Sequence, residues 1–216
     1  MKIFLDSADP AEIKQAREIW PVDGVTTNPT LMARRGGDST AVLKEIADLV
    51  SGPVAAEVVA TDRQGIIDEG RTLAGLAGNI VVKIPINRHG IEAAGKLAAE
   101  GIDTMLTLVF TTAQAIMCAR AGATYICPFV GRLDDIGQVG TELVDEIMTV
   151  FDQYEIPTRV VVASIRNPQH VIDSAIAGAF AATLPLKVVD QMLHHPLTDK
   201  GIELFLRDWE KVKKQE

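Results

Sequence analysis

The sequence predicts an α/β fold, a single (β/α)8 TIM barrel with an additional C-terminal helix. Eight short apolar runs typical of buried strands recur along the 216 residues, and segments with helical periodicity lie between them. Strands that alternate with helices build right-handed βαβ units around a parallel sheet, and eight such units close most simply into a barrel. No linker interrupts this alternation, so we expect one domain over residues 1–216.

The predicted strands are short and almost continuously apolar. Such runs are typical of parallel strands covered by helices, because both faces of each strand are buried. The eight runs comprise residues 2–6, 24–28, 54–60, 80–85, 105–110, 125–130, 159–164 and 180–186. The composition agrees, since 47% of the residues are hydrophobic but only 5% are aromatic, as expected for aliphatic helices packed on a buried sheet.

Helical periodicity is clearest in four segments between the strands, at residues 10–20, 39–50, 141–154 and 167–179. Three helix starts combine an Asp or Asn cap with a proline in the first turn, which is a preferred arrangement. These caps are Asp9, Asn28 and Asn167. The Arg-Arg-Gly-Gly segment at residues 34–37 indicates an exposed loop.

A further helix is predicted after the last strand, at about residues 198–214. Ile202, Phe205, Leu206 and Trp209 lie on one stripe of this helix, which is therefore amphipathic. The apolar stripe needs a surface against which to pack. We expect that surface to belong either to the barrel or to a neighbouring subunit.

The charge balance and the cysteine content limit partners and location. A formal net charge of -8 disfavours nucleic acid and anionic membranes as partners, because both need a dense basic surface, although a local pocket for one phosphate remains compatible. Cys118 and Cys127 form no CxxC pair, the N-terminus lacks signal-peptide features, and no apolar run is long enough to span a bilayer. These features predict a cytoplasmic protein.

No motif predicts a metal or an organic cofactor. His194 and His195 are adjacent near a helix end, so their side chains point in different directions, which disfavours a shared metal site. The sequence has no Walker loop, no GxGxxG after a strand and no GxSxG. We therefore expect no cofactor.

Polar side chains cluster near the carboxyl ends of the predicted strands. In a (β/α)8 barrel these ends meet at one mouth, where the reacting groups of barrel enzymes lie. The candidates are Asp6, Thr26, Thr27, Asn28, Glu57, Lys83, Thr107, Arg132, Ser164 and Arg166. The two arginines indicate an anionic group on the ligand, because guanidinium forks match phosphate oxygens. Each candidate is also compatible with a purely structural role, such as helix capping, strand formation or exposure to solvent at the surface.

Lys83 differs from the other candidates because it lies in the middle of the apolar run NIVVKIPI. A buried ammonium must be desolvated or paired, and a strand covered by helices leaves little room to reach solvent. Burial favours the neutral amine, the nucleophilic form that makes a Schiff base with a carbonyl substrate. The alternative is a buried ion pair with Glu57 on the adjacent strand, and one lysine can serve both purposes.

Six ordered motifs resemble those of the transaldolase family, in the short-chain branch that also contains fructose-6-phosphate aldolases. They are FLDSAD, GVTTNPTL, IVVKIP, TLVFTTAQA, PFVGRLDD and VVVASIRN, and the resemblance extends along essentially the whole chain. It implies a metal-independent enzyme of the pentose phosphate pathway in which Lys83 attacks the C2 carbonyl of a ketose phosphate. It also implies a homo-oligomer, a pentamer or a decamer, in which the C-terminal helix contacts a neighbour.

The resemblance implies roles for four catalytic residues. Lys83 carries the Schiff base, and Asp6 is the general base that removes the proton of the C4 hydroxyl so that the C3–C4 bond breaks. Glu57 and Thr107 match the positions that hold a catalytic water. Cleavage releases an aldose phosphate and leaves a three-carbon enamine on Lys83, with the iminium as the electron sink.

The resemblance also implies the substrate-binding residues. Asn28 matches a residue that binds the hydroxyls of the dihydroxyacetone unit, and Thr27 and Phe129 stand in motifs that face the same mouth. The phosphate site matches Arg132, Ser164 and Arg166. A related branch that handles sulfonated sugars has tryptophan in place of Arg132, so this arginine favours a phosphate.

The two activities of this branch differ in what happens to the enamine. A transaldolase passes it to glyceraldehyde 3-phosphate or erythrose 4-phosphate, whereas a fructose-6-phosphate aldolase releases dihydroxyacetone. The aldolases have glutamine and tyrosine where this chain has Glu57 and Phe129, and phenylalanine cannot relay a proton to the enamine. We therefore expect a transaldolase with sedoheptulose 7-phosphate or fructose 6-phosphate as donor. The alternatives are the aldolase and a barrel that binds sugar phosphates without turnover.

Overall fold

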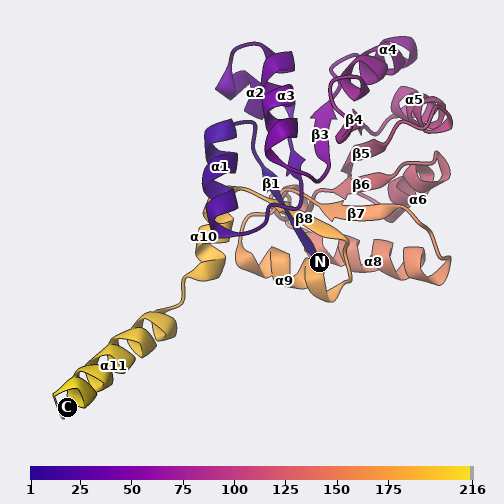
Figure 1. Ribbon diagram of the computed structural model, residues 1–216. Coiled ribbons are helices and arrows are strands. Elements are labelled where there is room, and N and C mark those ends of the chain that lie inside the picture. Colours follow the sequence, from indigo (N-terminus) through magenta and orange to yellow (C-terminus); the bar gives the residue numbers. More distant parts are fainter. Residues whose placement is uncertain (215–216) are drawn as a thin grey trace.

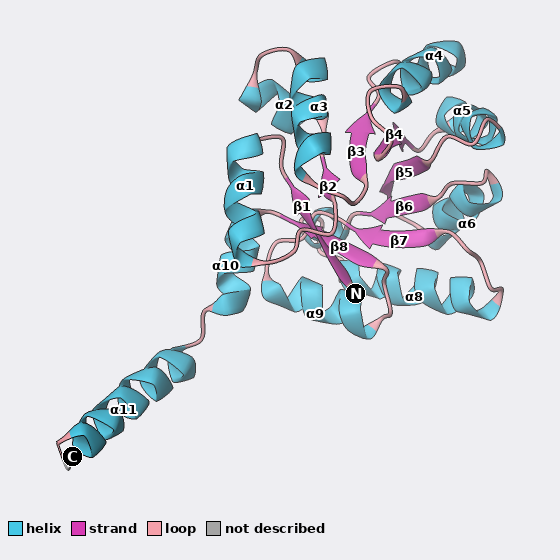
Figure 2. Ribbon diagram, viewed as in Figure 1, coloured by secondary structure: helices cyan, strands magenta, loops and turns pink. Residues whose placement is uncertain are grey.

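The computed structural model of the chain describes residues 1–214. Its strands are β1 (Lys2–Asp6), β2 (Val25–Thr26), β3 (Val54–Glu57), β4 (Ile80–Pro85), β5 (Thr104–Val109), β6 (Tyr125–Pro128), β7 (Arg159–Val162) and β8 (Ala181–Leu184). All pair in parallel with their neighbours in chain order, and β8 pairs with β1 to close the barrel. The predicted barrel is therefore confirmed, with strands in the centre and helices around them (Figure 2).

Helices cover the outside of the barrel (Figure 1). One regular helix follows each strand: α1 (Pro10–Ile19), α3 (Ser39–Leu49), α4 (Arg63–Ala74), α5 (Arg88–Ala99), α6 (Thr112–Arg120), α8 (Gly140–Gln153), α9 (Pro168–Ile176) and α10 (Leu186–Leu193). Two short additional helices, α2 (Pro29–Arg35) and α7 (Val130–Asp134), begin just beyond the carboxyl ends of β2 and β6. Through this position they bring further side chains to the mouth of the barrel.

The three predicted helix caps are confirmed. The side chains of Asp9, Asn28 and Asn167 accept hydrogen bonds from backbone N–H groups in the first turns of α1, α2 and α9, each over 3.0 Å. Each cap satisfies an N–H group that has no partner within its own helix. These caps fix the point at which the chain leaves the barrel mouth.

Several predicted strands extend too far at their carboxyl ends. The predicted runs 125–130 and 180–186 end as strands at Pro128 and Leu184, and the run 54–60 ends at Glu57. The apolar runs continue past the strands because Val130 and Leu186, the first residues of the helices that follow, are also buried. An apolar run indicates only that its residues are buried. It does not show where the strand ends, because the first turn of the next helix can be buried as well.

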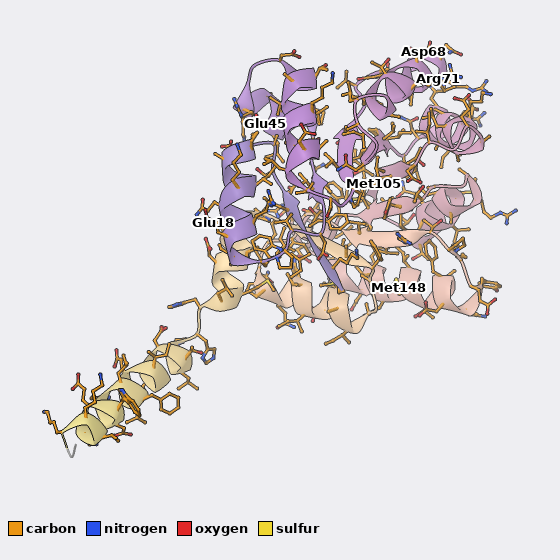
Figure 3. All side chains as sticks on the ribbon, in the orientation of Figure 1. Glu18, Glu45, Asp68, Arg71, Met105 and Met148 are labelled. Carbon is orange, nitrogen blue, oxygen red and sulfur yellow. The ribbon has the colours of Figure 1, made fainter. Side chains whose placement is uncertain are left out.

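Two layers of apolar side chains form the core. A large outer cluster packs the strands against the helices, and a smaller cluster fills the inside of the barrel. The inner cluster includes Phe4, Met105 and Tyr125, and Figure 3 marks Met105 among the strands, whereas Glu45 and Arg71 lie on the outer helices. The barrel is therefore closed from within, and only the layer above these side chains is open to a ligand.

The predicted C-terminal helix is present as α11 (Pro196–Lys213) and projects away from the barrel (Figure 1). None of its described residues is buried. Of the two surfaces considered for its apolar stripe, its own barrel is not the one that it packs against, because the connection at His194 and His195 leads the chain away from the barrel. Among residues 1–214, no helix combines the length and the apolar character needed to cross a membrane.

Candidate active site

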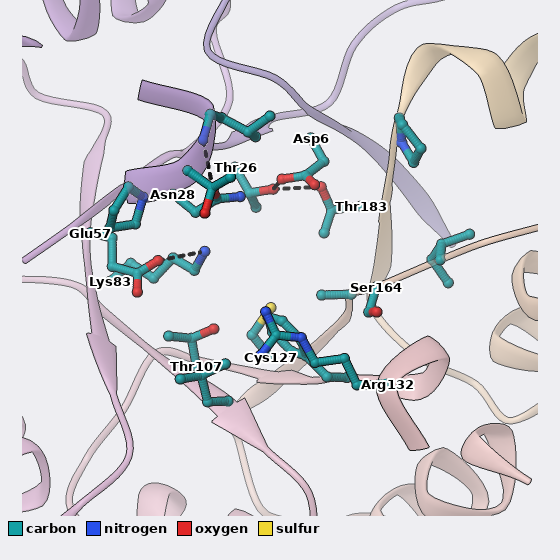
Figure 4. Close-up of a pocket in the computed structure, with 18 of the residues that line it drawn as sticks. Asp6, Thr26, Asn28, Glu57, Lys83, Thr107, Cys127, Arg132, Ser164 and Thr183 are labelled. Carbon is teal, nitrogen blue, oxygen red and sulfur yellow. Dashed lines mark hydrogen bonds and ion pairs between the residues drawn. The ribbon is translucent and has the colours of Figure 1, made fainter. Parts of the chain in front are cut away.

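A cavity of about 540 Å³ lies at the carboxyl ends of the strands (Figure 4). Apart from Thr27, every predicted site residue lines it: Asp6, Thr26, Asn28, Glu57, Lys83, Thr107, Phe129, Arg132, Ser164 and Arg166. Lys83 and Glu57 lie on one side of the cavity, and Arg132 and Ser164 lie on the other. The barrel thus brings together residues that are spread over 160 positions of the chain, from Asp6 to Arg166.

Lys83 lies on β4 and is almost completely enclosed, with 4% of its side chain exposed. Its Nζ atom is 3.0 Å from Oε2 of Glu57 and donates a hydrogen bond to the carbonyl oxygen of Thr27 over 2.9 Å. The strand register explains the ion pair, because Glu57 on β3 is the direct neighbour of Lys83. The buried ion pair is therefore present, and Glu57 is positioned to accept a proton from the ammonium.

Thr27 contributes its backbone rather than its side chain. Its hydroxyl donates to the carbonyl oxygen of Ala55 over 2.8 Å, which ties β2 to β3, while its own carbonyl oxygen faces Lys83. Thr27 is not among the residues that line the cavity. The Thr27 hydroxyl is therefore engaged within the barrel wall, and its carbonyl oxygen is the atom that contacts Lys83.

Asp6 closes β1 and is held by a chain of hydroxyl groups. Thr26 donates to Oδ1 of Asp6 over 2.9 Å, and the hydroxyls of Thr26 and Thr183 are 2.7 Å apart. Burial raises the pKa of the Asp6 carboxyl above its usual value, while the charge of Lys83 and the hydrogen bond from Thr26 oppose that rise. A carboxyl group with a raised pKa is well suited to exchange protons near neutral pH.

The Thr26 hydroxyl provides a test of this arrangement. Replacing Thr26 with valine removes a hydrogen bond that favours the carboxylate, so the pKa of Asp6 should rise further. If Asp6 acts as a base, the acidic limb of the activity profile should move to higher pH, which a kcat/KM measurement across pH detects. Thr183→Val is the matched control, because the Thr183 hydroxyl is hydrogen-bonded to Thr26 and not to Asp6. An unmoved acidic limb in Thr26→Val would contradict the assignment of that limb to Asp6.

Thr107 presents a buried hydroxyl to the cavity. This hydroxyl has no hydrogen-bond partner among the described residues. The chain is irregular just beyond it, because the β5–β6 register shifts between Thr107 and Val109 and Leu108 has a φ of 60°. Since buried polar groups in proteins are rarely left unpaired, we expect this hydroxyl to gain a partner when a ligand or a water binds in the cavity.

The basic residues occupy the opposite rim. Arg132 on α7 lies over the ring of Phe129, with its guanidinium carbon 5.3 Å from the ring centre. Arg166 follows β7, and its Nη2 atom is 2.6 Å from Oδ2 of Asp135. Ser164 lies two residues before Arg166 in the same connection and has a φ of 59°, a backbone conformation that residues other than glycine rarely adopt. This cluster can hold an anionic group at a distance from Lys83.

Some lining residues were not among the predicted site residues. Thr183 and Cys127 line the cavity from β8 and β6, and both stand in predicted strands, so a search for polar residues near strand ends finds them. Burial raises the pKa of the Cys127 thiol to about 12, which keeps it neutral. The loop predicted at residues 34–37 is wrong in its first half, because Arg34 and Arg35 form the end of α2 and Arg34 lines the cavity.

The two adjacent histidines have separate structural contacts. His195 caps α11 by accepting a hydrogen bond from the N–H group of Leu197 over 3.1 Å, and His194 lies 3.7 Å from a carboxyl oxygen of Asp199. Within residues 1–214, no group of three or more His, Cys, Asp or Glu side chains is arranged to hold a metal ion.

Comparison with known proteins identifies the family. Residues 3–216 match the family described as Transaldolase/Fructose-6-phosphate aldolase. The chain belongs to this family. The membership confirms the resemblance inferred from the six motifs, and it supports a transaldolase-type enzyme.

Family relatives of similar length support the same activity class. A "Probable transaldolase" of Aquifex aeolicus is 53% identical over 212 residues, covering 98% of each chain. A "Probable transaldolase" of Geotalea uraniireducens is 52% identical over 214 residues, covering 99% of this chain and all of the relative. A "Probable transaldolase" of Methanococcus maripaludis is 53% identical over 210 residues, covering 97% of this chain and 98% of the relative.

A solved structure outside the transaldolase family shares the barrel. A double mutant of flavocytochrome b2 with sulfite bound superposes with a TM-score of 0.60 at 15% identity, over 84% of this chain and 56% of that one. This likeness concerns the fold alone.

Proposed function

We propose that this protein is a transaldolase that acts through a Schiff base on Lys83. Its donor is sedoheptulose 7-phosphate or fructose 6-phosphate, its acceptor is glyceraldehyde 3-phosphate or erythrose 4-phosphate, and its place is the cytoplasmic pentose phosphate pathway. The observation that carries the proposal is the enclosed Lys83, paired with Glu57 at a cavity that also contains Asp6 and a basic rim. The chemistry needs no cofactor.

Schiff-base formation begins with the ion pair. Glu57 accepts a proton from the Lys83 ammonium, and the neutral amine attacks C2 of the ketose to form a carbinolamine. Loss of the C2 oxygen as water then gives the iminium. In this proposal Glu57, 3.0 Å from Nζ, and Thr107, whose buried hydroxyl lacks a partner among the described residues, hold a water and return the proton that this loss requires.

Carbon–carbon cleavage uses Asp6. The carboxylate removes the proton of the C4 hydroxyl, the C3–C4 bond breaks, and its electron pair flows into the iminium to leave an enamine. Fructose 6-phosphate thus releases glyceraldehyde 3-phosphate, and sedoheptulose 7-phosphate releases erythrose 4-phosphate. Attack of the enamine on the acceptor aldehyde reverses these steps, and Asp6 returns its proton to the new hydroxyl.

The substrate is held at both ends. Oδ1 of Asn28 is used in capping α2, so its amide nitrogen is the group that donates to hydroxyls of the dihydroxyacetone unit. The phosphate end is bound by Arg132, Ser164 and Arg166 on the opposite rim. A guanidinium cluster suits a phosphate because it offers paired charge-assisted hydrogen bonds.

Reductive trapping tests the proposed function. Treatment with fructose 6-phosphate and borohydride should leave a reduced three- or six-carbon adduct on Lys83, which peptide mass mapping locates. A control reaction without sugar should leave Lys83 unmodified. If Lys83 carries no adduct while the protein remains folded, the mechanism is wrong.

Phe129 provides the test of transfer against release. Its ring packs edge-on against Phe110 and carries no hydroxyl that could protonate the enamine. Phe129→Tyr should therefore raise dihydroxyacetone release from fructose 6-phosphate relative to transfer to erythrose 4-phosphate, by about 10-fold if the hydroxyl acts as a general acid. The two rates are measured with and without the acceptor.

Phe110→Tyr is the matched control for this change. It adds a hydroxyl to the partner ring, which is not among the residues that line the cavity. An equal partition ratio in wild type and Phe129→Tyr would show that this position does not control the fate of the enamine.

We also propose that the protein is a homo-oligomer, a pentamer or a decamer, in which α11 packs on a neighbouring subunit. The support is that α11 exposes apolar side chains on its outer stripe, including Phe205 at 72% and Trp209 at 59%. Such a surface is unfavourable in a free monomer. Light scattering of wild type should give a multiple of 23.3 kDa. The double variant Phe205→Glu/Trp209→Glu should dissociate, whereas Glu203→Ala on the same helix should not.

A further inference from the structure

The segments that carry the proposed phosphate site are tied together outside the cavity. Arg132 belongs to α7, whereas Ser164 and Arg166 belong to the connection between β7 and α9. Two consecutive carboxylates at the end of α7 reach across to the second segment. Oδ2 of Asp134 is 2.8 Å from Nε2 of His170, and Oδ2 of Asp135 is 2.6 Å from Nη2 of Arg166.

His170 is the buried centre of this connection. The residue lies in the first turn of α9 and is only 9% exposed. Its Nδ1 atom accepts a hydrogen bond from the backbone N–H group of Arg166 over 3.4 Å. A ring nitrogen that accepts carries no hydrogen, so Nε2 bears the hydrogen and donates it to Asp134. The imidazole therefore links the Arg166 backbone to α7 in one defined orientation.

Asp134 is itself anchored on its other side. Its Oδ1 atom accepts a hydrogen bond from the N–H group of Gly140 over 2.8 Å, at the start of α8. The two carboxylate oxygens thus join α8 to His170 of α9. An asparagine at this position would place an NH2 group where one of these two oxygens accepts, so it can serve only one of the two donors in this geometry.

The two segments also pack closely enough that a side chain is excluded between them. A Cβ atom added to Gly131 would lie 2.2 Å from the carbonyl oxygen of Ser164 and 2.7 Å from Nε of Arg166. The Arg166 side chain therefore passes over Gly131 on its way to Asp135. Ser164 keeps its left-handed conformation in this contact, and such a conformation persists only where the surroundings enforce it.

We propose that His170 and Asp134 are positioning residues that set the phosphate specificity of the cavity. Neither lines the cavity. They act by holding the Ser164–Arg166 backbone against α7, so that both arginines and the serine face one phosphate at the spacing that it requires. This inference rests on the proposed function, because it concerns recognition of the phosphate of that substrate.

The test is to break the link while leaving the Lys83 region intact. His170→Leu should raise KM for fructose 6-phosphate and the inhibition constant for inorganic phosphate by about 10-fold each, the size expected from losing an oriented charged hydrogen bond. Borohydride trapping of dihydroxyacetone on Lys83 should stay within about two-fold of wild type, because this ligand has no phosphate. Asp134→Asn should change the same constants in the same direction, and His170→Gln, which keeps a donor toward Asp134, should recover part of the loss.

Val171→Ala is the matched control, since it removes buried apolar contacts from the same helix without touching the hydrogen-bonded link. It should lower the melting temperature and leave the phosphate constants unchanged. The inference is overturned if His170→Leu weakens phosphate binding and dihydroxyacetone trapping equally, or if it changes neither. A wild-type protein that fails to trap any ligand on Lys83 would instead contradict the proposed function, so the two failures are distinguishable.

Discussion

Replacing Lys83 with methionine is expected to lower the rate of dihydroxyacetone transfer by about 10⁴-fold or more, because no other lysine of the described chain lines the cavity to supply the covalent electron sink. The variant should also show no borohydride adduct with either fructose 6-phosphate or dihydroxyacetone. Transfer is measured by coupling release of glyceraldehyde 3-phosphate to its dehydrogenation, with erythrose 4-phosphate as acceptor. Substantial transfer by this variant would rule out the Schiff-base mechanism.

The same change should reduce stability for an electrostatic reason. Glu57, with only 12% of its side chain exposed, would lose the cation 3.0 Å away. Removing one partner of a buried pair costs about 3 kcal/mol, unless the remaining group takes up a proton. The matched control is Lys83→Met combined with Glu57→Gln, which removes both charges. This double variant should regain most of the stability but none of the activity, so thermal unfolding separates folding from catalysis.

Replacing Asp6 with asparagine is expected to lower transfer by about 10²- to 10⁴-fold, the usual contribution of a general base. In contrast to the lysine variant, it should still form the Schiff base. Borohydride should trap dihydroxyacetone on Lys83 at nearly the wild-type level, because trapping needs no carbon–carbon cleavage. Loss of trapping together with loss of transfer would show that Asp6 acts in an earlier step.

Asp6→Asn should also change how stability depends on pH. Because burial raises the pKa of Asp6 in the folded chain above its ordinary value of 3.8, the folded state binds the proton more tightly than the unfolded state. Ionisation of Asp6 therefore costs stability as the pH rises from the ordinary value through the raised one. Asparagine does not ionise and has no such cost. The melting temperature of the variant should therefore rise relative to that of wild type as the pH increases over that range. A constant difference across pH would contradict the raised pKa.

Much of the fold and many of the residues of the candidate site were predictable, because the relevant signals are local in the sequence. An Asp or Asn before a proline predicts the start of a helix from about three neighbouring residues. An apolar run predicts a buried segment from about six neighbouring residues. Lys83 was conspicuous because a charge in the middle of such a run demands a partner, and the adjacent strand offered Glu57. The strand ends were less predictable, since Val130 and Leu186 are apolar as parts of helices and not of strands.

Other features depend on contacts between distant parts of the chain. Arg34 resembled a loop residue beside two glycines, and only the path of α2 over the mouth brings it to the cavity. Thr183 reaches the site because β8 closes against β1, which places it beside Thr26. In the sequence, His170 is an ordinary residue in the first turn of a predicted helix. No nearby residue predicts its contact with Asp134.

Lys83 illustrates which features of the site follow from the sequence and which follow only from the tertiary structure. The sequence by itself determined that an amine is buried in the fourth of eight βα units and that polar groups gather near the same strand ends, because spacing and polarity set these features. The tertiary structure alone decided that the amine contacts the Thr27 carbonyl, that hydroxyls from β2 and β8 hold Asp6, and that the carboxylates at the end of α7 pair with Arg166 and His170. Such contacts follow from barrel closure and strand register, which bring together residues far apart in the chain.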